Sequence, residues 1–259
     1  DRTAEAGEAL AGLGDIPDLP AFYVARGRLL EDLRGRDGTA DHRRAVALAP
    51  DDRLMHVALA QHLESSGDWN ASLDALGEAR SRFPGDFNLA LFEARALVRG
   101  LRPEEALEIL SAVNVLPSEH ARGTRQLYAD AHTLLALDAM EEDQHSAARG
   151  HLRQALEWPE SLGEGRPYEQ EERLVQFLLG LVERETEGGD AGLEHFQAVI
   201  DATPVGNAPA GSLDRLGTAA RRVVAEGVGD PRRAGAATAE PESLQDELVR
   251  RALALAGVR

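Results

Sequence analysis

The sequence predicts an all-α protein, built as a solenoid of stacked antiparallel helix pairs. Hydrophobic residues make up 43% of the chain, but only 4% of the residues are aromatic. Its core must therefore be built largely from Ala, Leu and Val, and Ala and Leu are strong helix formers. Prolines that follow helical stretches recur at Pro50, Pro84 and Pro117, with spacings of 34 and 33 residues. Repeats of this length are typical of helical solenoids, so we expect a right-handed superhelix without a β-sheet.

One complete repeat unit spans residues 53–84. Its first helix carries Ala60 where the two helices are expected to cross, and Gly67 ends that helix in a left-handed conformation. The second helix ends before Pro84, which cannot continue a helix. The inward positions of the second helix share one face, and they are Ser72, Leu76 and Ala79. The whole pattern resembles the tetratricopeptide repeat (TPR), which has a period of 34 residues.

The same pattern predicts further units on both sides of this one. Downstream, the matching positions are Ala94, Leu97, Ala106, Leu110 and Val113. Upstream, they are Gly27, Leu30, Ala45 and Pro50. A longer unit is expected to consist of helices 119–140 and 144–157. The pattern then returns with a helix over 167–186, and its matching positions are Leu179, Gly180, Phe196, Val199 and Pro204.

These elements divide the chain into three parts. Residues 1–17 are expected to form an N-terminal helix, the second half of an earlier repeat. Residues 18–204 form an array of about five units, the fourth and fifth elongated. Residues 205–259 hold C-terminal helices over 211–226 and 242–256, separated by a loop near 227–240 that is rich in Gly, Ala and Pro.

Two segments carry a more specific resemblance. They are Asn114-Val115-Leu116-Pro117-Ser118-Glu119, followed by Tyr128, and the run Trp-Pro-Glu-Ser-Leu-Gly-Glu-Gly-Arg-Pro-Tyr over 158–168. Together they resemble the C-terminal TPR region of a family of large bacterial proteins with an N-terminal domain of unknown function. The resemblance covers residues 18–200. It implies that this chain is the repeat portion of a longer protein, whose carbohydrate-related role would belong to the other domain.

Composition excludes several classes of partner. The formal net charge of −17 disfavours the phosphate backbone of nucleic acids and anionic membrane surfaces. No apolar run approaches the roughly 18 residues of a membrane span. The chain has no Cys, so disulfides and thiolate chemistry are excluded, and a cytoplasmic location is favoured.

The first candidate binding surface follows from the TPR resemblance, which implies that the first helix of each unit lines a concave groove. Positions counted from the crossing residue that would face this groove are Arg28, Gln61, Glu64, Arg95 and Arg99. Arg95 and Arg99 lie one helical turn apart and could clamp a carboxylate. The alternative is an ordinary solvated, charged helix face.

The second candidate is the 158–168 segment, which presents aromatic and charged groups between two helices. Its candidate contact residues are Trp158, Glu160, Arg166 and Tyr168. In the alternative interpretation, the two aromatic rings are buried and brace a wide gap between repeats. The sequence Gly163-Glu164-Gly165 is not a dinucleotide fingerprint, because it follows a helix and lacks the third glycine.

No catalytic, cofactor or metal site is expected. His56 and His62 are six residues apart, as are His145 and His151, so neither pair shares a helix face. The acidic runs are interpreted as solvated faces. The sequence therefore favours a non-enzymatic scaffold or adaptor that binds a peptide or partner domain. The alternative is an auxiliary arm that packs on an upstream domain of a larger, carbohydrate-related enzyme.

Overall fold

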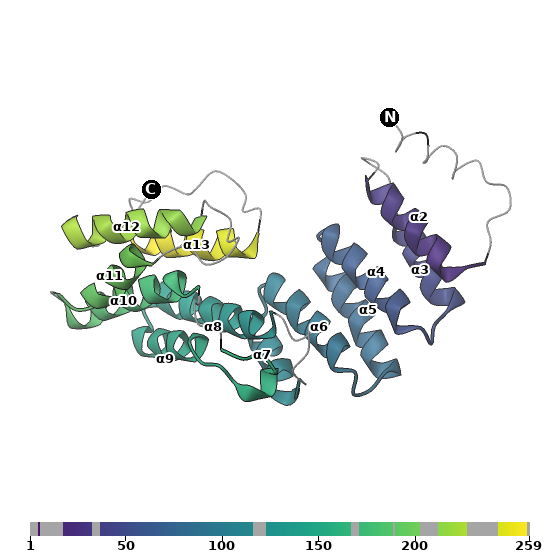
Figure 1. Cartoon of the computed structure of the whole chain (residues 1–259), viewed down its shortest axis with the longest axis horizontal. Coiled ribbons are helices and arrows are strands. Elements are labelled where there is room, and N and C mark those ends of the chain that lie inside the picture. The colour runs from purple at the N-terminus through teal and green to yellow at the C-terminus, as the bar shows by residue number, and fades with distance from the viewer. Residues whose placement is uncertain are drawn as a thin grey trace. The chain divides into compact units, whose positions relative to one another are not determined.

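The structure of the chain is a computed structural model (Figure 1). It describes residues 5, 18–32, 37–115, 123–166, 171–188, 190–202, 212–226 and 243–257. Within these ranges the chain forms twelve α-helices and no strand, which confirms the all-α prediction. The expected N-terminal helix, apart from Glu5, and the expected loop at 227–240 lie outside the described residues.

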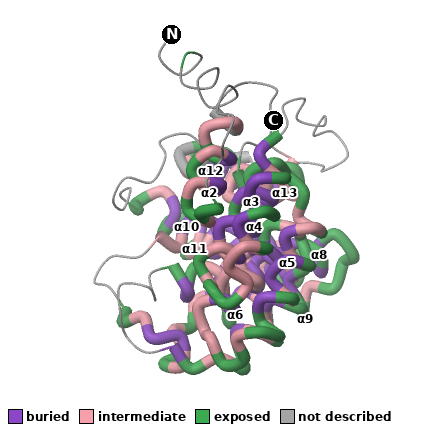
Figure 2. Tube along the Cα trace, turned by 90° about the vertical axis from the view of Figure 1, so that its right-hand side faces the viewer, coloured by how far each residue is buried: buried purple, intermediate pink, exposed green. Residues whose placement is uncertain are grey.

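The chain divides into two compact units, Asp1–Val113 and Asn114–Arg259. The helices of the first unit are α2 (Pro20–Asp32), α3 (Thr39–Leu48), α4 (Arg53–Ser65), α5 (Trp69–Arg82), α6 (Phe87–Arg99) and α7 (Pro103–Ala112). They form the successive pairs α2–α3, α4–α5 and α6–α7 (Figure 1). The first helices also contact one another in the order α2, α4, α6. Buried segments are concentrated where α3, α4 and α5 pack together (Figure 2).

The second unit continues the pairing and then departs from it. Its helices are α8 (Thr124–Glu141), α9 (His145–Ala155), α10 (Arg173–Glu187), α11 (Leu193–Asp201), α12 (Ser212–Glu226) and α13 (Leu244–Leu255). A 3-10 turn, Glu160–Leu162, follows α9. Helices α8 to α12 pack in sequence, but α13 packs on α8, α10 and α12. Its apolar face is therefore buried against the first helices of the preceding pairs.

Aspartates determine where three helices of the first unit begin. The side chains of Asp52, Asp68 and Asp86 stand at the N-caps of α4, α5 and α6 and accept hydrogen bonds from backbone N–H groups of the first turn. Such caps satisfy donors that have no partner within the helix. At the other end of α4, Gly67 has φ +78°, as its predicted role requires.

Several helix ends differ from the sequence prediction. Helix α9 ends at Ala155, before the expected residue 157. Helix α10 begins at Arg173 and not at residue 167, since the described residues 171 and 172 are not helical. Helix α13 ends at Leu255, one residue before the expected end. These shifts leave the expected inward faces unchanged.

Small residues recur where paired helices approach each other. Four pairs of buried positions lie twelve residues apart, and they are Ala60 with Ser72, Ala94 with Ala106, Ala136 with Ala148, and Gly180 with Gly192. Ser72 Oγ donates a hydrogen bond of 3.1 Å to the carbonyl oxygen of Ala60. A Cβ atom on Gly180 would lie 2.8 Å from the ring of Phe196. Close approach of the helices therefore depends on small residues at these positions.

We expect Ala60→Leu to destabilise the first unit by about 1–3 kcal/mol, because it overpacks this crossing. Ala60 is 1% exposed and packs in one cluster with Leu76 and Ala79. Gly77→Ala in α5 is the control, since a Cβ there meets nothing within 4 Å and should stabilise the helix by about 0.5–1 kcal/mol. Denaturant unfolding of both variants measures the difference. An Ala60→Leu protein as stable as wild type would contradict the crossing geometry.

Candidate functional site

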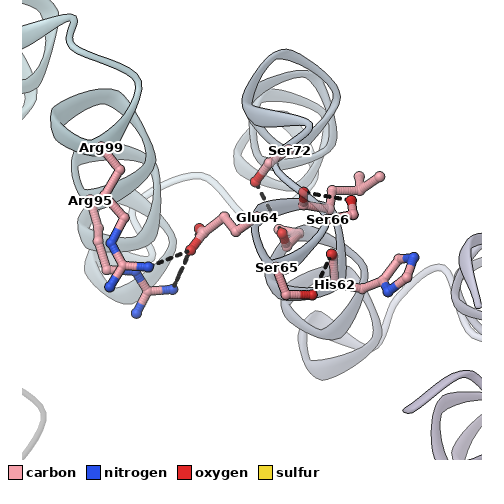
Figure 3. A network of polar contacts seen from close by, with 9 residues as sticks. His62, Glu64, Ser65, Ser66, Ser72, Arg95 and Arg99 are labelled. Atoms are coloured by element: carbon pink, nitrogen blue, oxygen red, sulfur yellow. Dashed lines mark hydrogen bonds and ion pairs between the residues drawn. The ribbon is translucent and has the colours of Figure 1, made fainter. Parts of the chain in front are cut away.

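The candidate site of the first unit centres on a buried carboxylate between α4 and α6. Glu64 extends from the last turn of α4, and its side chain is only 5% exposed. Its Oε2 lies 3.2 Å from Arg95 Nη2 and 3.8 Å from Arg99 Nη1 (Figure 3). The two arginines are one turn apart on α6, and both guanidinium groups face the carboxylate. The predicted clamp thus holds a carboxylate of the chain itself.

The guanidinium of Arg95 is held on more than one side. It lies 4.7 Å from the centre of the Phe92 ring, a cation–π contact on the same helix. Its Nε is buried and has no hydrogen-bond partner among the described residues. The side chain of Arg95 is 30% exposed and that of Arg99 is 49% exposed. Two guanidinium groups therefore face one carboxylate and remain accessible from solvent.

This cluster of two arginines and one glutamate carries more positive than negative charge, on a chain whose formal net charge is −17. One Glu cannot neutralise two Arg, and the carboxylate is far less exposed than either guanidinium. Arginine presents several N–H donors in a planar fork that suits a carboxylate. Exposed ion pairs contribute little to stability, so the second arginine is poorly explained by folding alone.

The other predicted groove positions lie on the same side of the first helices. Arg28 follows the crossing residue Gly27, Gln61 follows Ala60, and Arg95 follows Ala94. Arg28 and Gln61 are exposed. Since the first helices α2, α4 and α6 contact one another, we expect these equivalent positions to form a polar row that includes Arg95 of the clamp.

The corresponding positions of the second unit are different. Leu137 follows Ala136 in α8 and Leu181 follows Gly180 in α10, and both are buried, at 0% and 2% exposure. Helix α13 packs on both α8 and α10. Its Arg251 pairs with Asp138 and Glu141 of α8, at 2.6 and 2.8 Å. In this unit, therefore, a helix of the chain itself covers the face of the first helices.

The 158–166 part of the second predicted site is held against α8 by Arg125. This buried side chain donates hydrogen bonds to the carbonyl oxygens of Ala155, at 2.6 Å, and Glu157, at 3.3 Å. Its guanidinium lies 4.5 Å from the centre of the Trp158 ring. Burial lowers the pKa of Arg125. The backbone N–H of Arg125 also donates to the carboxylate of Glu164, at 3.1 Å.

These contacts favour a bracing role for Trp158, which is partly buried. Glu160 and Arg166 are exposed and remain accessible, while Tyr168 lies outside the described residues. Sequence reasoning missed Arg125, because an Arg in the first turn of a helix gives no signal that it will be buried. The segment and the Arg95–Arg99 clamp belong to different units.

A cavity of about 250 Å³ lies beside Arg125, between α8, α10 and the start of α13. Its polar lining includes Asp130, Thr133, Glu172 and Gln245. Burial raises the pKa of Asp130 to about 6. One carboxylate oxygen of Glu172 is buried and has no hydrogen-bond partner among the described residues. The cavity can hold water or a small polar group.

Most of the histidines considered in the sequence have structural partners. His56 Nε2 lies 2.8 Å from the carbonyl oxygen of Pro50, and His62 Nε2 lies 2.7 Å from Thr39 Oγ1. His132 and His151 approach each other between α8 and α9, with their Nδ1 atoms 3.2 Å apart. His195 belongs to a group of potential metal ligands at the junction of α10 and α11, together with Glu183 and Glu194.

In comparisons with known proteins, no protein-family model matches the chain, and no curated protein matches it. Within the part of the chain that the structure describes, no helix has both the length and the apolar character needed to cross a bilayer.

Proposed function

We propose that the chain is a cytoplasmic TPR-type interaction module, and that its first unit binds a carboxylate-bearing segment of a protein partner. The TPR assignment is supported by paired helices whose small crossing residues are spaced by twelve, as Ala60 and Ser72 are. The binding role is supported chiefly by one observation. Arg95 and Arg99 converge on a single, largely buried carboxylate, while their own side chains are 30% and 49% exposed.

The partner follows from the charge balance of this surface. An incoming carboxylate can accept hydrogen bonds from the exposed side of the clamp, and charge-assisted bonds of this kind are stronger than neutral ones. The exposed Arg28 and Gln61 extend the polar row along α2 and α4. The acidic remainder of the chain repels general polyanions, so a short acidic peptide with a free carboxylate fits better than a nucleic acid.

The test starts from a library of short acidic peptides with free C-terminal carboxylates, screened against the wild-type chain. For the best binder, we expect Arg95→Ala with Arg99→Ala to weaken binding by about 1–3 kcal/mol, or about 5- to 150-fold. A triple variant adds Glu64→Gln to these two changes. Without it, the double variant would leave the buried Glu64 carboxylate charged and without its arginine partners. Glu64→Gln alone should strengthen binding, because it removes the internal competitor. Calorimetric titration measures all four proteins.

Arg102→Ala is the matched control. It removes the N-cap residue of α7, whose guanidinium pairs with Glu105 of that helix at 2.6 Å, outside the clamp. Binding should be unchanged in this variant. If the clamp variants bind as well as wild type while their circular dichroism is intact, the interaction-module proposal fails. The auxiliary-arm alternative then becomes the better explanation.

A further inference from the structure

Three potential metal ligands meet at the junction of α10 and α11. Glu183 comes from α10, while Glu194 and His195 come from the first turns of α11. One ligand atom from each lies within 4.8 Å of the other two. His195 Nε2 and Glu183 Oε2 are 3.4 Å apart, and their side chains are 19% and 21% exposed. The group is therefore partly shielded but open to solvent through the exposed Glu194.

The imidazole of His195 is oriented from its other side. Its Nδ1 lies 2.7 Å from Oε1 of Gln176, which is two turns before Glu183 on α10. An amide oxygen only accepts, so Nδ1 carries the proton of this hydrogen bond. In the neutral ring, Nε2 then carries the lone pair, and it lies 3.4 Å from Oε2 of Glu183. Two acceptors at this separation repel each other, and a proton or a metal ion between them would remove that repulsion.

The separation of these two atoms suits a metal ion. Zinc binds His nitrogen at about 2.0–2.1 Å and carboxylate oxygen at about 2.0–2.2 Å, which places two tetrahedral ligands about 3.3 Å apart. The observed 3.4 Å is close to this value. Glu194 is exposed, so its side chain can turn toward the same point. Outer partners such as Gln176 are a regular feature of His ligands, because they fix the tautomer and the ring orientation.

We propose that Glu183, Glu194 and His195 form a site for a divalent cation of the zinc type, with Gln176 as the residue that positions His195. One imidazole and two carboxylates match the preference of borderline metals over Mg²⁺, which favours oxygen ligands and retains its water. A bound ion would connect α10 to α11 directly. A fourth coordination position remains for water or for a side chain of a partner.

The test uses the full chain, stripped of metal with a chelator and titrated with Zn²⁺ at pH 7.5 by calorimetry. We expect binding of one ion per chain and a higher melting temperature with Zn²⁺ than without it. His195→Ala should abolish this binding, and Glu183→Gln should weaken it at least tenfold. Gln176→Leu should weaken it about 10- to 100-fold without removing a ligand. Mg²⁺ at the same concentration should have no effect.

His145→Ala is the matched control. His145 Nε2 lies 3.6 Å from Glu185 Oε2, a similar His–Glu pair, which is not part of a three-ligand group among the described residues. Zinc binding should be retained in this variant. Equal loss in His145→Ala and His195→Ala would show non-specific binding to surface histidines and overturn the proposal. Absence of stoichiometric binding to the wild-type chain would overturn it as well.

Discussion

Replacing Gly192 by alanine is expected to destabilise the second unit strongly. Gly192 stands at the start of α11 with φ +76°, a conformation that L-residues with a side chain rarely adopt. A Cβ atom there would lie 2.9 Å from the Cα of Gly180 and closer still to its carbonyl oxygen. Backbone strain costs about 1–3 kcal/mol, and overpacking costs a further 1–3 kcal/mol or so. Denaturant unfolding of the full chain measures the effect.

Gly150→Ala provides the comparison for this variant. Gly150 lies within α9, and a Cβ atom there meets nothing within 4 Å. The same chemical change should therefore raise stability by about 0.5–1 kcal/mol. If both alanine variants unfold at the same denaturant concentration, the close approach of α10 and α11 is not a constraint on the fold.

Lowering the pH from 6.5 to 4 is expected to destabilise the second unit through His132. Burial, together with the neighbouring His151, lowers the pKa of His132 from its ordinary value of 6.5 to about 4. Between these values the unfolded chain holds more protons than the folded chain, so stability falls as the pH falls. Each pKa unit corresponds to about 1.36 kcal/mol, so the loss is on the order of 3 kcal/mol.

His132→Phe isolates this contribution, because it retains a ring beside Tyr128 and cannot take up a proton. Urea unfolding between pH 4 and pH 7 should show a smaller loss for this variant than for wild type. Asp130 acts with the opposite sign, because its raised pKa of about 6 favours the folded state at low pH. Asp130→Asn should therefore steepen the decline. An unchanged pH profile in His132→Phe would contradict the assignment.

The sequence was sufficient to predict those parts of the fold that local patterns determine. Ala60, Leu76 and Ala79 are buried at the expected crossing, and Gly67 has the expected positive φ. These features depend on helix periodicity and backbone conformation, which neighbouring residues set. The prediction was wrong for the N-terminal end of α10, which follows the 158–166 segment. Arg125 of α8 holds this part of the chain through a hydrogen bond to the carbonyl oxygen of Ala155.

The candidate sites were harder to predict, because their residues come from different helices. Glu64 and Arg95 are 31 residues apart, and their ion pair depends on the contact between α4 and α6. The group around His195 likewise needs Glu183 from the preceding helix. A search for metal ligands along single helices cannot find it. One difference between the two units was nevertheless visible in the sequence. The residue after the crossing position is polar in α4, where it is Gln61, and apolar in α8, where it is Leu137.

The position of α13 makes the two units unequal as binding partners. A peptide segment that bound to the face of α8 and α10 would have to displace α13. It would also have to break the ion pairs of Arg251 with Asp138 and Glu141. A competitor tethered within one chain acts at an effective concentration of about millimolar, whatever the concentration of the protein. For a free ligand of ordinary micromolar affinity, α13 is therefore a strong competitor for the face of α8 and α10.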